Sequence, residues 1–227
     1  MKIKQKGDNE ERPVKVSAGK VTLEGILGVP KSARGVVLFA HGSGSGRHSP
    51  RNRYVAEVFR KVGLATLLID LLTPAEEAVD LRTMHLRFNI ELLAERLVGA
   101  TDWIRRNAET QKPRTGYFGA STGAAAALVA AVERSDIIDA IVSRGGRPDL
   151  AGAALPLVKA PTLLIVGGKD IPIIDINQDA LNQLHVEKEL VIIPGATHLF
   201  EEPGALDQVA QLAANWFLRH LGGERLK

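Results

Sequence analysis

Residues 115–133 read TGYFGASTGAAAALVAAVE, and the fold that we expect is organised around this stretch. A short β-rich run meets the tight turn GASTG, and an alanine-rich helical run follows at once. In a strand–turn–helix of this G-x-S-x-G pattern, the central residue, Ser121, adopts a strained backbone conformation that exposes its hydroxyl above the strand end. A glycine-rich turn that holds an incidental serine can have the same sequence. The rest of the chain is therefore needed to distinguish a catalytic serine from an incidental one.

The composition predicts one folded domain with a substantial core. The chain has 227 residues, of which 45% are hydrophobic, and this fits a single α/β domain over residues 14–227. The polar residues 1–13 are expected to form a flexible N-terminal segment or an edge element. Twenty-nine basic against twenty-six acidic residues leave a net charge of only +3, so we expect no nucleic-acid partner. Because the chain lacks cysteine, it has no disulfide, thiolate nucleophile or cysteine-ligated metal.

The sequence predicts neither a targeting segment nor a membrane segment. The first residues, MKIKQKGDNEERP, are charged and lack the apolar run of a signal peptide. The most apolar long segment, residues 124–132, is too short and too alanine-rich to span a bilayer. We therefore expect a cytoplasmic protein, a monomer or a homodimer, without a membrane partner.

Apolar strands alternate with helices after an opening pair of strands. Two antiparallel strands are predicted within residues 14–29, whereas residues 71–86 give no clear pattern. Further strands are expected at residues 35–42, 64–70, 115–118, 139–146, 161–168 and 189–194, and further helices at 52–62, 87–106, 176–184 and 205–221. This order predicts an α/β fold, with a mostly parallel sheet and helices on both faces. Ligands of such sheets bind beyond the carboxyl ends of the strands.

Two histidines follow predicted strands directly and are the candidates for a general base. A serine hydroxyl is a weak nucleophile, and it needs a base within hydrogen-bond reach that a third group orients. His41 follows the strand GVVLFA, and His198 lies on a short loop after the strand ELVIIP. Because His198 comes last in chain order, we predict that it is the base and that His41 anchors its own loop.

Asp170, just past the strand PTLLIVGG, is predicted to orient His198. Serine, aspartate and histidine then follow one another in the order expected on this architecture. An aspartate after a Gly-Gly pair is also a common turn former. The alternatives to it are Asp149, Asp175 and Asp179.

The glycine-rich loop at residues 42–46 is expected to supply a backbone donor for an oxyanion. We predict the N–H group of Ser43, or of its neighbour in this loop, as one donor. The other donor is the N–H of Thr122, the residue after the candidate nucleophile. The loop sequence GSGSG lacks the G-x-G-x-x-G spacing of a dinucleotide-binding loop.

These segments together resemble a known family. From about residue 21 to residue 221 the chain is similar to α/β-hydrolases, and to their dienelactone hydrolase-like branch in particular. The resemblance is carried by FAHGSGSGRHSPRN, YFGASTGAAAAL, SRGGRPDL, LLIVGGKD and PGATHLFEEPG, in this order. It implies an α/β-hydrolase fold with an antiparallel N-terminal strand pair and no large cap domain. Similar domains also occur beside phosphoribosyltransferase domains in bacteria.

The resemblance also implies a reaction. We expect a carboxylic ester hydrolase that cleaves small esters or lactones through an acyl-enzyme on Ser121, with His198 and Asp170 and with neither metal nor organic cofactor. True dienelactone hydrolases are expected to carry a cysteine where this chain has serine, which argues against dienelactone as the substrate. The alternatives are thioester or amide hydrolysis, acyl transfer on the same triad, or a non-catalytic binding protein.

Basic residues near the predicted mouth of the site offer partners for an acidic substrate group. Arg47 and His48 follow the glycine-rich loop, and Arg144 follows the strand after the alanine-rich helix. Arginine suits bidentate recognition of a carboxylate, so we predict that these three residues contact the substrate. The alternative is that they are ordinary solvated residues of loops and helix starts.

Overall fold

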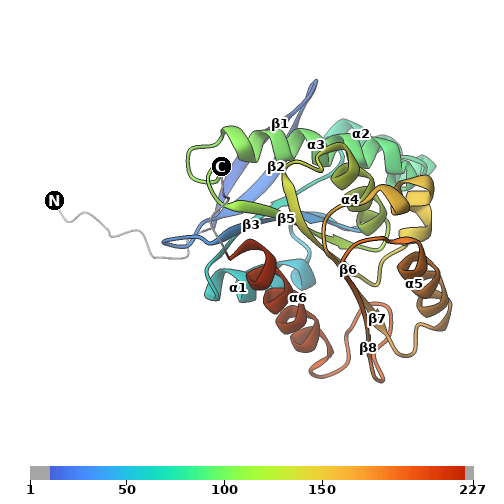
Figure 1. Ribbon diagram of the computed structural model, residues 1–227. Helices are drawn as coiled ribbons and strands as arrows, with labels where there is room; N and C mark the ends of the chain where they lie inside the picture. Colours follow the sequence, from blue (N-terminus) through green and yellow to red (C-terminus); the bar gives the residue numbers. More distant parts are fainter. Residues whose placement is uncertain (1–10, 223–227) are drawn as a thin grey trace.

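Eight strands form one sheet in the order β1-β2-β4-β3-β5-β6-β7-β8 (Figure 1). The computed structural model describes residues 11–222 of the chain. β3 to β8 are parallel, and only the β1–β2 and β2–β4 pairings are antiparallel, so the predicted sheet is confirmed. The strands are β1 Glu11–Ala18, β2 Val21–Gly28, β3 Gly35–Ala40, β4 Leu64–Ile69, β5 Arg114–Ala120, β6 Ile138–Arg144, β7 Thr162–Gly167 and β8 Lys188–Ile193.

The opening strand pair lies at one edge of the sheet. β1 pairs with β2 along its whole length, from Glu11 opposite Gly28 to Ala18 opposite Val21. Residues 11–13 therefore belong to the edge strand β1, so of the two predictions for them the edge element is correct and the flexible segment is wrong. They are ordered because their backbone completes the ladder opposite the end of β2. The rest of that predicted segment, residues 1–10, lies outside the described residues.

Helices cover both faces of the sheet, as predicted. α1 and α6 pack on one face, and α3, α4 and α5 pack on the other (Figure 1). None of the described helices is long and apolar enough to cross a bilayer. The helices are α1 Pro50–Lys61, α2 Pro74–Thr83, α3 Ile90–Arg106, α4 Thr122–Glu133, α5 Ile171–Gln183 and α6 Ala205–Leu221, with the short 3₁₀ segments η1 Leu86–Phe88 and η2 Pro148–Leu157.

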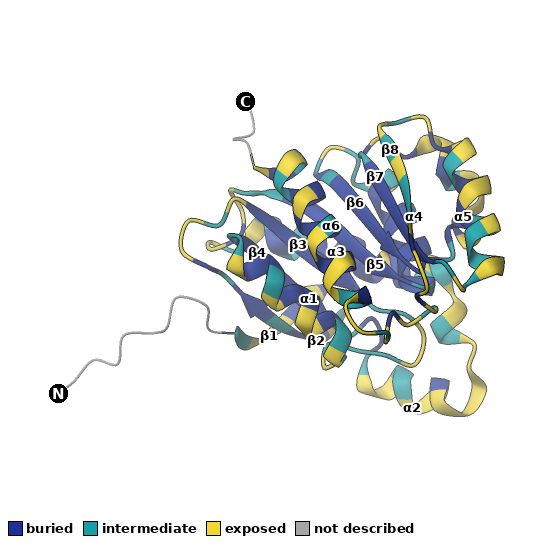
Figure 2. Cartoon of the chain, turned by 90° about the horizontal axis from the view of Figure 1, so that it is seen from below, coloured by how far each residue is buried: buried dark blue, intermediate teal, exposed yellow. Residues whose placement is uncertain are grey.

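The sheet is buried between these two helical layers (Figure 2). Every residue of β3, β4 and β7 is buried, as their continuous apolar sequences require. On the face of α1 and α6, four phenylalanine rings pack with centroids 5.0–5.7 Å apart. They are Phe39, Phe59, Phe118 and Phe217. Burying each such side chain contributes roughly 1.5–3 kcal/mol, so this layer holds β3 and β5 firmly below the site.

Residues 71–86, which gave no clear pattern, contain α2. Thr73 and Glu76 form a capping box, in which Thr73 Oγ1 accepts from the Glu76 N–H and the Glu76 carboxylate accepts from the Thr73 N–H. Pro74 occupies the first turn, where its missing N–H costs nothing. The sequence TPAE carried this signal, but α2 buries only Asp80 and is otherwise largely exposed, so no apolar period marks it (Figure 2).

α5 begins earlier than the sequence predicted. It starts at Ile171 rather than at residue 176, and Pro172 fits its first turn. Asp175 and Asp179 therefore lie inside α5, whereas Asp170 immediately precedes it. This placement leaves Asp170 as the aspartate at the carboxyl end of β7.

Candidate active site

Ser121 lies at the turn between β5 and α4 with the strained backbone that the sequence predicted. Its φ of 49° and ψ of −122° fall outside the regions that residues with a side chain ordinarily adopt. A Cβ added at Gly123 would lie 2.3 Å from the Ala40 carbonyl oxygen. Only glycine therefore allows α4 to begin so close to the end of β3. Strain of this kind persists where the surrounding structure fixes it and is concentrated at functional sites.

The segment after β6 holds both backbone groups of Ser121. The Ser121 N–H donates to the Arg144 carbonyl at 3.4 Å, and the Arg147 N–H donates to the Ser121 carbonyl at 3.1 Å. Between them, Gly145 has a φ of 49° and packs against His198, since a Cβ added there would lie 3.5 Å from His198 Nδ1. One short segment thus contacts both the candidate nucleophile and the candidate base.

Asp170 and His198 form the hydrogen bond that the order of the triad predicts. The distance from His198 Nδ1 to Asp170 Oδ2 is 2.6 Å, and the aspartate side chain is only 14% exposed. Of the alternatives, Asp149 pairs instead with Arg147. Over residues 11–222, no hydrogen bond joins the Ser121 hydroxyl to His198. Such bonds are commonly long in empty sites and tighten around a substrate.

Backbone and carboxylate contacts hold the loop that carries His198. The Lys169 N–H donates to the Ala196 carbonyl at 2.9 Å, so the loops after β7 and β8 are bound together. The Thr197 N–H donates to both carboxylate oxygens of Glu202 at 3.1 Å. This N–H holds the pKa of Glu202 below its usual value. The sequence analysis did not identify Glu202. Carboxylates near loops are common, and the sequence does not show that the Thr197 N–H donates to this one.

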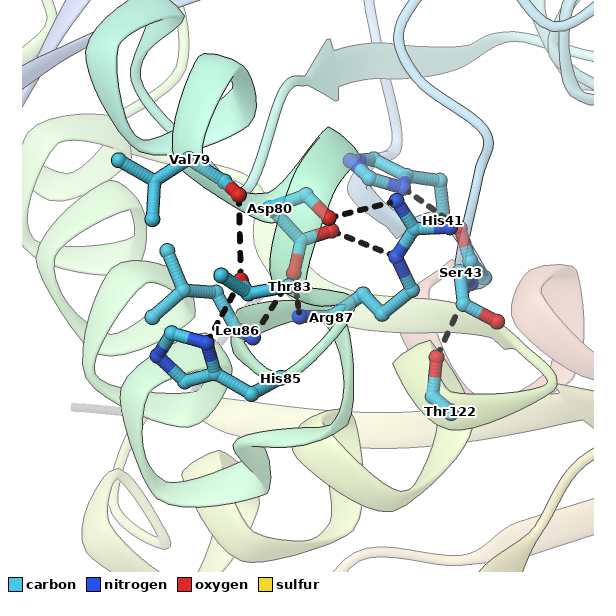
Figure 3. Close-up of polar contacts among 10 residues, drawn as sticks. His41, Ser43, Val79, Asp80, Thr83, His85, Leu86, Arg87 and Thr122 are labelled. Atoms are coloured by element: carbon cyan, nitrogen blue, oxygen red, sulfur yellow. Dashed lines mark hydrogen bonds and ion pairs between the residues drawn. The ribbon is translucent and has the colours of Figure 1, made fainter.

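The predicted oxyanion loop is fastened to the start of α4. The Ser43 N–H donates to Thr122 Oγ1 at 3.1 Å (Figure 3). A turn closes the loop, with the Ser45 N–H donating to the Gly42 carbonyl at 3.2 Å. A Cβ added at Gly42 would lie 3.0 Å from Ser121 Cβ, so the loop lies directly beside the candidate nucleophile. The N–H of the predicted donor Ser43 therefore points at a hydroxyl of its own chain.

His41 anchors this region, as predicted. Its Nδ1 lies 2.9 Å from the Gly42 carbonyl, and the Leu71 N–H donates to its Nε2 at 3.0 Å. Only the neutral imidazole with its proton on Nδ1 can make both contacts. Burial of the ring lowers the pKa of His41. The Gly42 carbonyl and the carboxylates of Asp70 and Glu77 raise this pKa, but by less than burial lowers it.

We expect His41 to make folding stability depend on pH below about 6.5. An unfolded histidine has a pKa of about 6.5, and the folded value is lower, so the unfolded state binds the proton first as the pH falls. Stability that is fully present above that pH is lost as the pH falls from about 6.5 through the folded pKa. Urea unfolding of the native protein and of His41→Gln at pH 7.5, 6.5 and 5.5 measures this loss. The native curve must fall more steeply than that of the variant; equal slopes would contradict the assignment.

The three basic residues predicted to contact substrate have different surroundings. Arg47 forms an ion pair with Asp70, and its N–H also donates to Asp70 Oδ1 at 2.7 Å. His48 is exposed and lines a separate cavity beside α1 with residues of β1 and α1. Arg144 is only 8% exposed, and no ion pair involves it in the part of the chain that the structure describes. Of the three, Arg144 alone has a guanidinium without a carboxylate partner.

A cluster that the sequence did not reveal joins α2 to η1. Asp80 accepts from the N–H groups of Leu86 and Arg87 at 2.8 and 3.1 Å, and from Arg87 Nε at 2.5 Å (Figure 3). Although burial opposes it, Arg87 holds the pKa of Asp80 below its usual value. Arg87 also lines one cavity together with Ser43 and Thr122. Among the described residues, no group of three or more His, Asp or Glu side chains is placed to hold a metal ion.

The fold and these strand-end residues define a protein of the α/β-hydrolase type with a serine at the strained turn between β5 and α4. Over residues 23–221 the chain matches the dienelactone hydrolase family. It therefore belongs to the dienelactone hydrolase family, which confirms the resemblance inferred from the sequence.

One solved structure agrees with this membership, and a second shares the fold. A crystal structure of dienelactone hydrolase from Anabaena variabilis is 66% identical, with a TM-score of 0.93, over 94% of this chain and 99% of that one. Est1E from Butyrivibrio proteoclasticus has the same fold at 16% identity, with a TM-score of 0.76, over 92% of this chain and 98% of that one. A Mycobacterium tuberculosis protein named as a phosphoribosyl transferase is 56% identical over 213 residues. Those residues are 94% of this chain but 47% of that relative, so the chain spans about half of its length.

Proposed function

We propose that this protein is a serine hydrolase that cleaves carboxylic esters or lactones of small substrates. One observation carries the proposal: the strained Ser121 turn and the hydrogen-bonded pair of Asp170 and His198 both lie at the carboxyl edge of the same sheet. Membership in the dienelactone hydrolase family supports a hydrolase, and serine at this position favours esterase chemistry. We further propose a cytoplasmic monomer or homodimer with neither nucleic acid nor membrane as partner.

The first half of the proposed reaction forms an acyl-enzyme. The Ser121 hydroxyl attacks the ester carbonyl while His198 Nε2 takes its proton. The Asp170 carboxylate accepts a hydrogen bond from the Nδ1–H of His198, which fixes the tautomer that can act as a base and stabilises the imidazolium. His198 then passes its proton to the leaving alkoxide as the tetrahedral intermediate collapses.

Backbone donors stabilise the oxyanion of that intermediate in the proposed reaction. The N–H groups of Ser43 and Thr122 bind it, and the Ser43 N–H shares its hydrogen bond between the oxyanion and the Thr122 hydroxyl, which holds it in place. The N-terminus of α4 adds a favourable partial positive charge. In the second half, His198 activates a water molecule that attacks the acyl-enzyme and releases the acid. The proposed steps require neither metal nor organic cofactor.

Two classes of alternative function exist for a chain with this fold and these three residues: another reaction on the same residues, and non-catalytic binding. Thioester hydrolysis, amide hydrolysis or acyl transfer would need the same three residues, so only substrate screening separates them from ester hydrolysis. A non-catalytic binding protein would keep the fold without an activated serine. The name of the Mycobacterium tuberculosis relative belongs to a protein about twice as long, and we propose no phosphoribosyl transfer for this chain.

The test is covalent labelling with a fluorophosphonate, followed by peptide mass spectrometry. We expect a single adduct on Ser121, strongly reduced in His198→Ala. His185→Ala, which changes a histidine next to the end of α5, is the matched control and should label normally. A folded protein without any adduct would favour the binding-protein alternative.

We expect Thr122→Val to lower kcat about tenfold with little change in KM. The substitution keeps the shape of the side chain but removes the acceptor that holds the Ser43 N–H in place. Complete loss of an oxyanion donor costs about 10²–10³-fold, and a donor that is present but no longer held should cost less. Steady-state kinetics on a 4-nitrophenyl ester measures the effect, and Thr122→Ser, which keeps the hydroxyl, should retain kcat. A higher kcat in Thr122→Val would mean instead that the hydroxyl competes with the oxyanion.

A further inference from the structure

Asn177 is a fully buried amide on α5 that bonds to the segment after β6. Its side chain is 0% exposed, and its Nδ2 donates to the Gly146 carbonyl at 3.0 Å and to the Ile173 carbonyl at 2.8 Å. Both N–H donors of the amide are therefore used. Within residues 11–222, the bond to Gly146 is the one hydrogen bond that joins α5 to residues 144–147.

The oxygen atom of the same amide has no partner. Asn177 Oδ1 is enclosed without a hydrogen bond among the residues that the structure describes. A buried acceptor without a partner costs stability, and a leucine of similar size would not carry that cost. Filling of the core therefore does not explain an amide at this position. What asparagine supplies here is the donor to the Gly146 carbonyl.

Gly146 lies in the segment that contacts both Ser121 and His198. The residue before it, Gly145, packs against the His198 ring. The residue after it, Arg147, donates its N–H to the Ser121 carbonyl at 3.1 Å. A hydrogen bond to the Gly146 carbonyl therefore acts on the segment midway between its contacts with the candidate nucleophile and the candidate base.

Close packing at Gly146 transmits any shift of this segment to its neighbours. A Cβ added at Gly146 would lie 2.0 Å from Ser143 Oγ and 2.7 Å from the Cβ of Ala124, in the first turn of α4. Because α4 begins directly after Ser121, a displaced segment would press on the helix that fixes the Ser121 turn.

α5 in turn begins at the other half of the site. The N–H groups of Ile173 and Ile174 donate to the Asp170 carbonyl at 3.0 Å, and the Asp170 side chain holds His198. Asn177 comes seven residues after Asp170, about two turns along the same face of the helix. The helix that begins at Asp170 is thus bound by Asn177 to the segment that holds the Ser121 backbone.

We propose that Asn177 is a positioning residue for the proposed hydrolase reaction. Its hydrogen bond to Gly146 sets the placement of Ser121 relative to the pair of Asp170 and His198. The inference rests on the proposed function and adds to it a residue outside the three that carry the reaction. Misplacement of reacting groups by about 1 Å can cost about 100-fold in rate, so the effect should fall on kcat rather than on KM.

The kinetic experiment compares the native protein with Asn177→Leu on a 4-nitrophenyl ester. Leucine has a similar size but cannot donate to the Gly146 carbonyl. We expect kcat to fall about 10–100-fold with KM nearly unchanged. The change removes one unpartnered acceptor, Asn177 Oδ1, and creates another at Gly146, so the melting temperature should change little. A lower melting temperature with unchanged kcat would make Asn177 merely structural and overturn the proposal.

Two further variants complete the comparison. Asn182→Leu makes the same change at an exposed position of α5 and should leave kcat unchanged. Asn177→Ser has a shorter side chain, whose hydroxyl donates to the carbonyl four residues back instead of to Gly146. It should lower kcat as well, and it serves as the test if Asn177→Leu does not fold. A rise in KM with unchanged kcat in the Asn177 variants would overturn the proposal.

Fluorophosphonate labelling distinguishes failure of this inference from failure of the proposed function. Ser121 should be labelled about 10–100-fold more slowly in Asn177→Leu than in the native protein, because labelling needs the same proton transfer to His198. Equal labelling rates in the two folded proteins would overturn the role of Asn177 and leave the hydrolase. A native protein that neither takes up the label nor hydrolyses esters would overturn the proposed function, and this inference with it.

Discussion

Replacement of Ser121 by alanine is expected to lower kcat on any substrate ester by about 10⁴–10⁶-fold. The proposed reaction passes through a covalent bond to its hydroxyl, and removing the nucleophile of a triad costs about as much as removing the whole triad. The residual rate should come only from the backbone donors and from binding. Steady-state kinetics on a 4-nitrophenyl ester, with active-site titration of the native protein, measures the loss.

The substitution should leave the folded structure intact. Alanine removes one oxygen atom, and the strained backbone of Ser121 is held from both sides by Arg144 and Arg147. Thermal unfolding of Ser121→Ala should therefore resemble that of the native protein. Ser135→Ala, just after α4, is the matched control and should keep full activity. Activity within tenfold of the native protein in Ser121→Ala would exclude the acyl-enzyme mechanism.

The second large effect is expected from Asp170→Asn, which should lower kcat about 10³–10⁴-fold with a much smaller change in KM. An amide in place of the carboxylate can donate to His198 Nδ1 and so favours the tautomer with its proton on Nε2. That tautomer cannot take a proton from Ser121. In a serine protease the corresponding change costs about 10⁴-fold for this reason. Kinetics with kcat and KM determined separately is the measurement.

Asp175→Asn is the matched control for this prediction. It makes the same change on the exposed side of α5, five residues further along the chain, and should leave kcat unchanged. If Asp170→Asn lost less than tenfold in kcat, another group would have to orient His198. Asp149 is the alternative by sequence, but its partner is Arg147.

The arrangement of the fold could be predicted well from the sequence. β3, β4 and β7 are apolar along their whole length, and α6 has a strong helical period, so burial alone marks them. The position of Ser121 followed from the turn that its neighbours permit. Asp170 and His198 could be identified as candidates because functional residues of parallel sheets lie at the carboxyl ends of the strands. The structure places the two side chains within hydrogen-bond distance of each other. Their catalytic roles stay predictions.

The partners of charged side chains could not be predicted. α2 is held by its capping box and by the bonds of Asp80 rather than by an apolar face, so no periodicity reveals it. Nothing in the sequence distinguishes Arg47, which has Asp70 beside it, from Arg144, which has no carboxylate partner. The partner of each arginine depends on which loops lie side by side in the folded protein. The spacing of residues along the sequence does not show this.

Residues 144–147 lie between the two halves of the candidate site, so the length of this segment affects how the two halves are aligned. Ser121 and the glycine-rich loop at residues 42–46 follow strands on one side of β6, and Asp170 and His198 follow strands on the other. Each half is bound together within itself, and the segment after β6 touches both. One added or deleted residue there would change the spacing of Ser121 and His198 while sparing the internal geometry of each half. Inherited or engineered length changes in residues 144–147 would therefore alter how the two halves of the site are aligned.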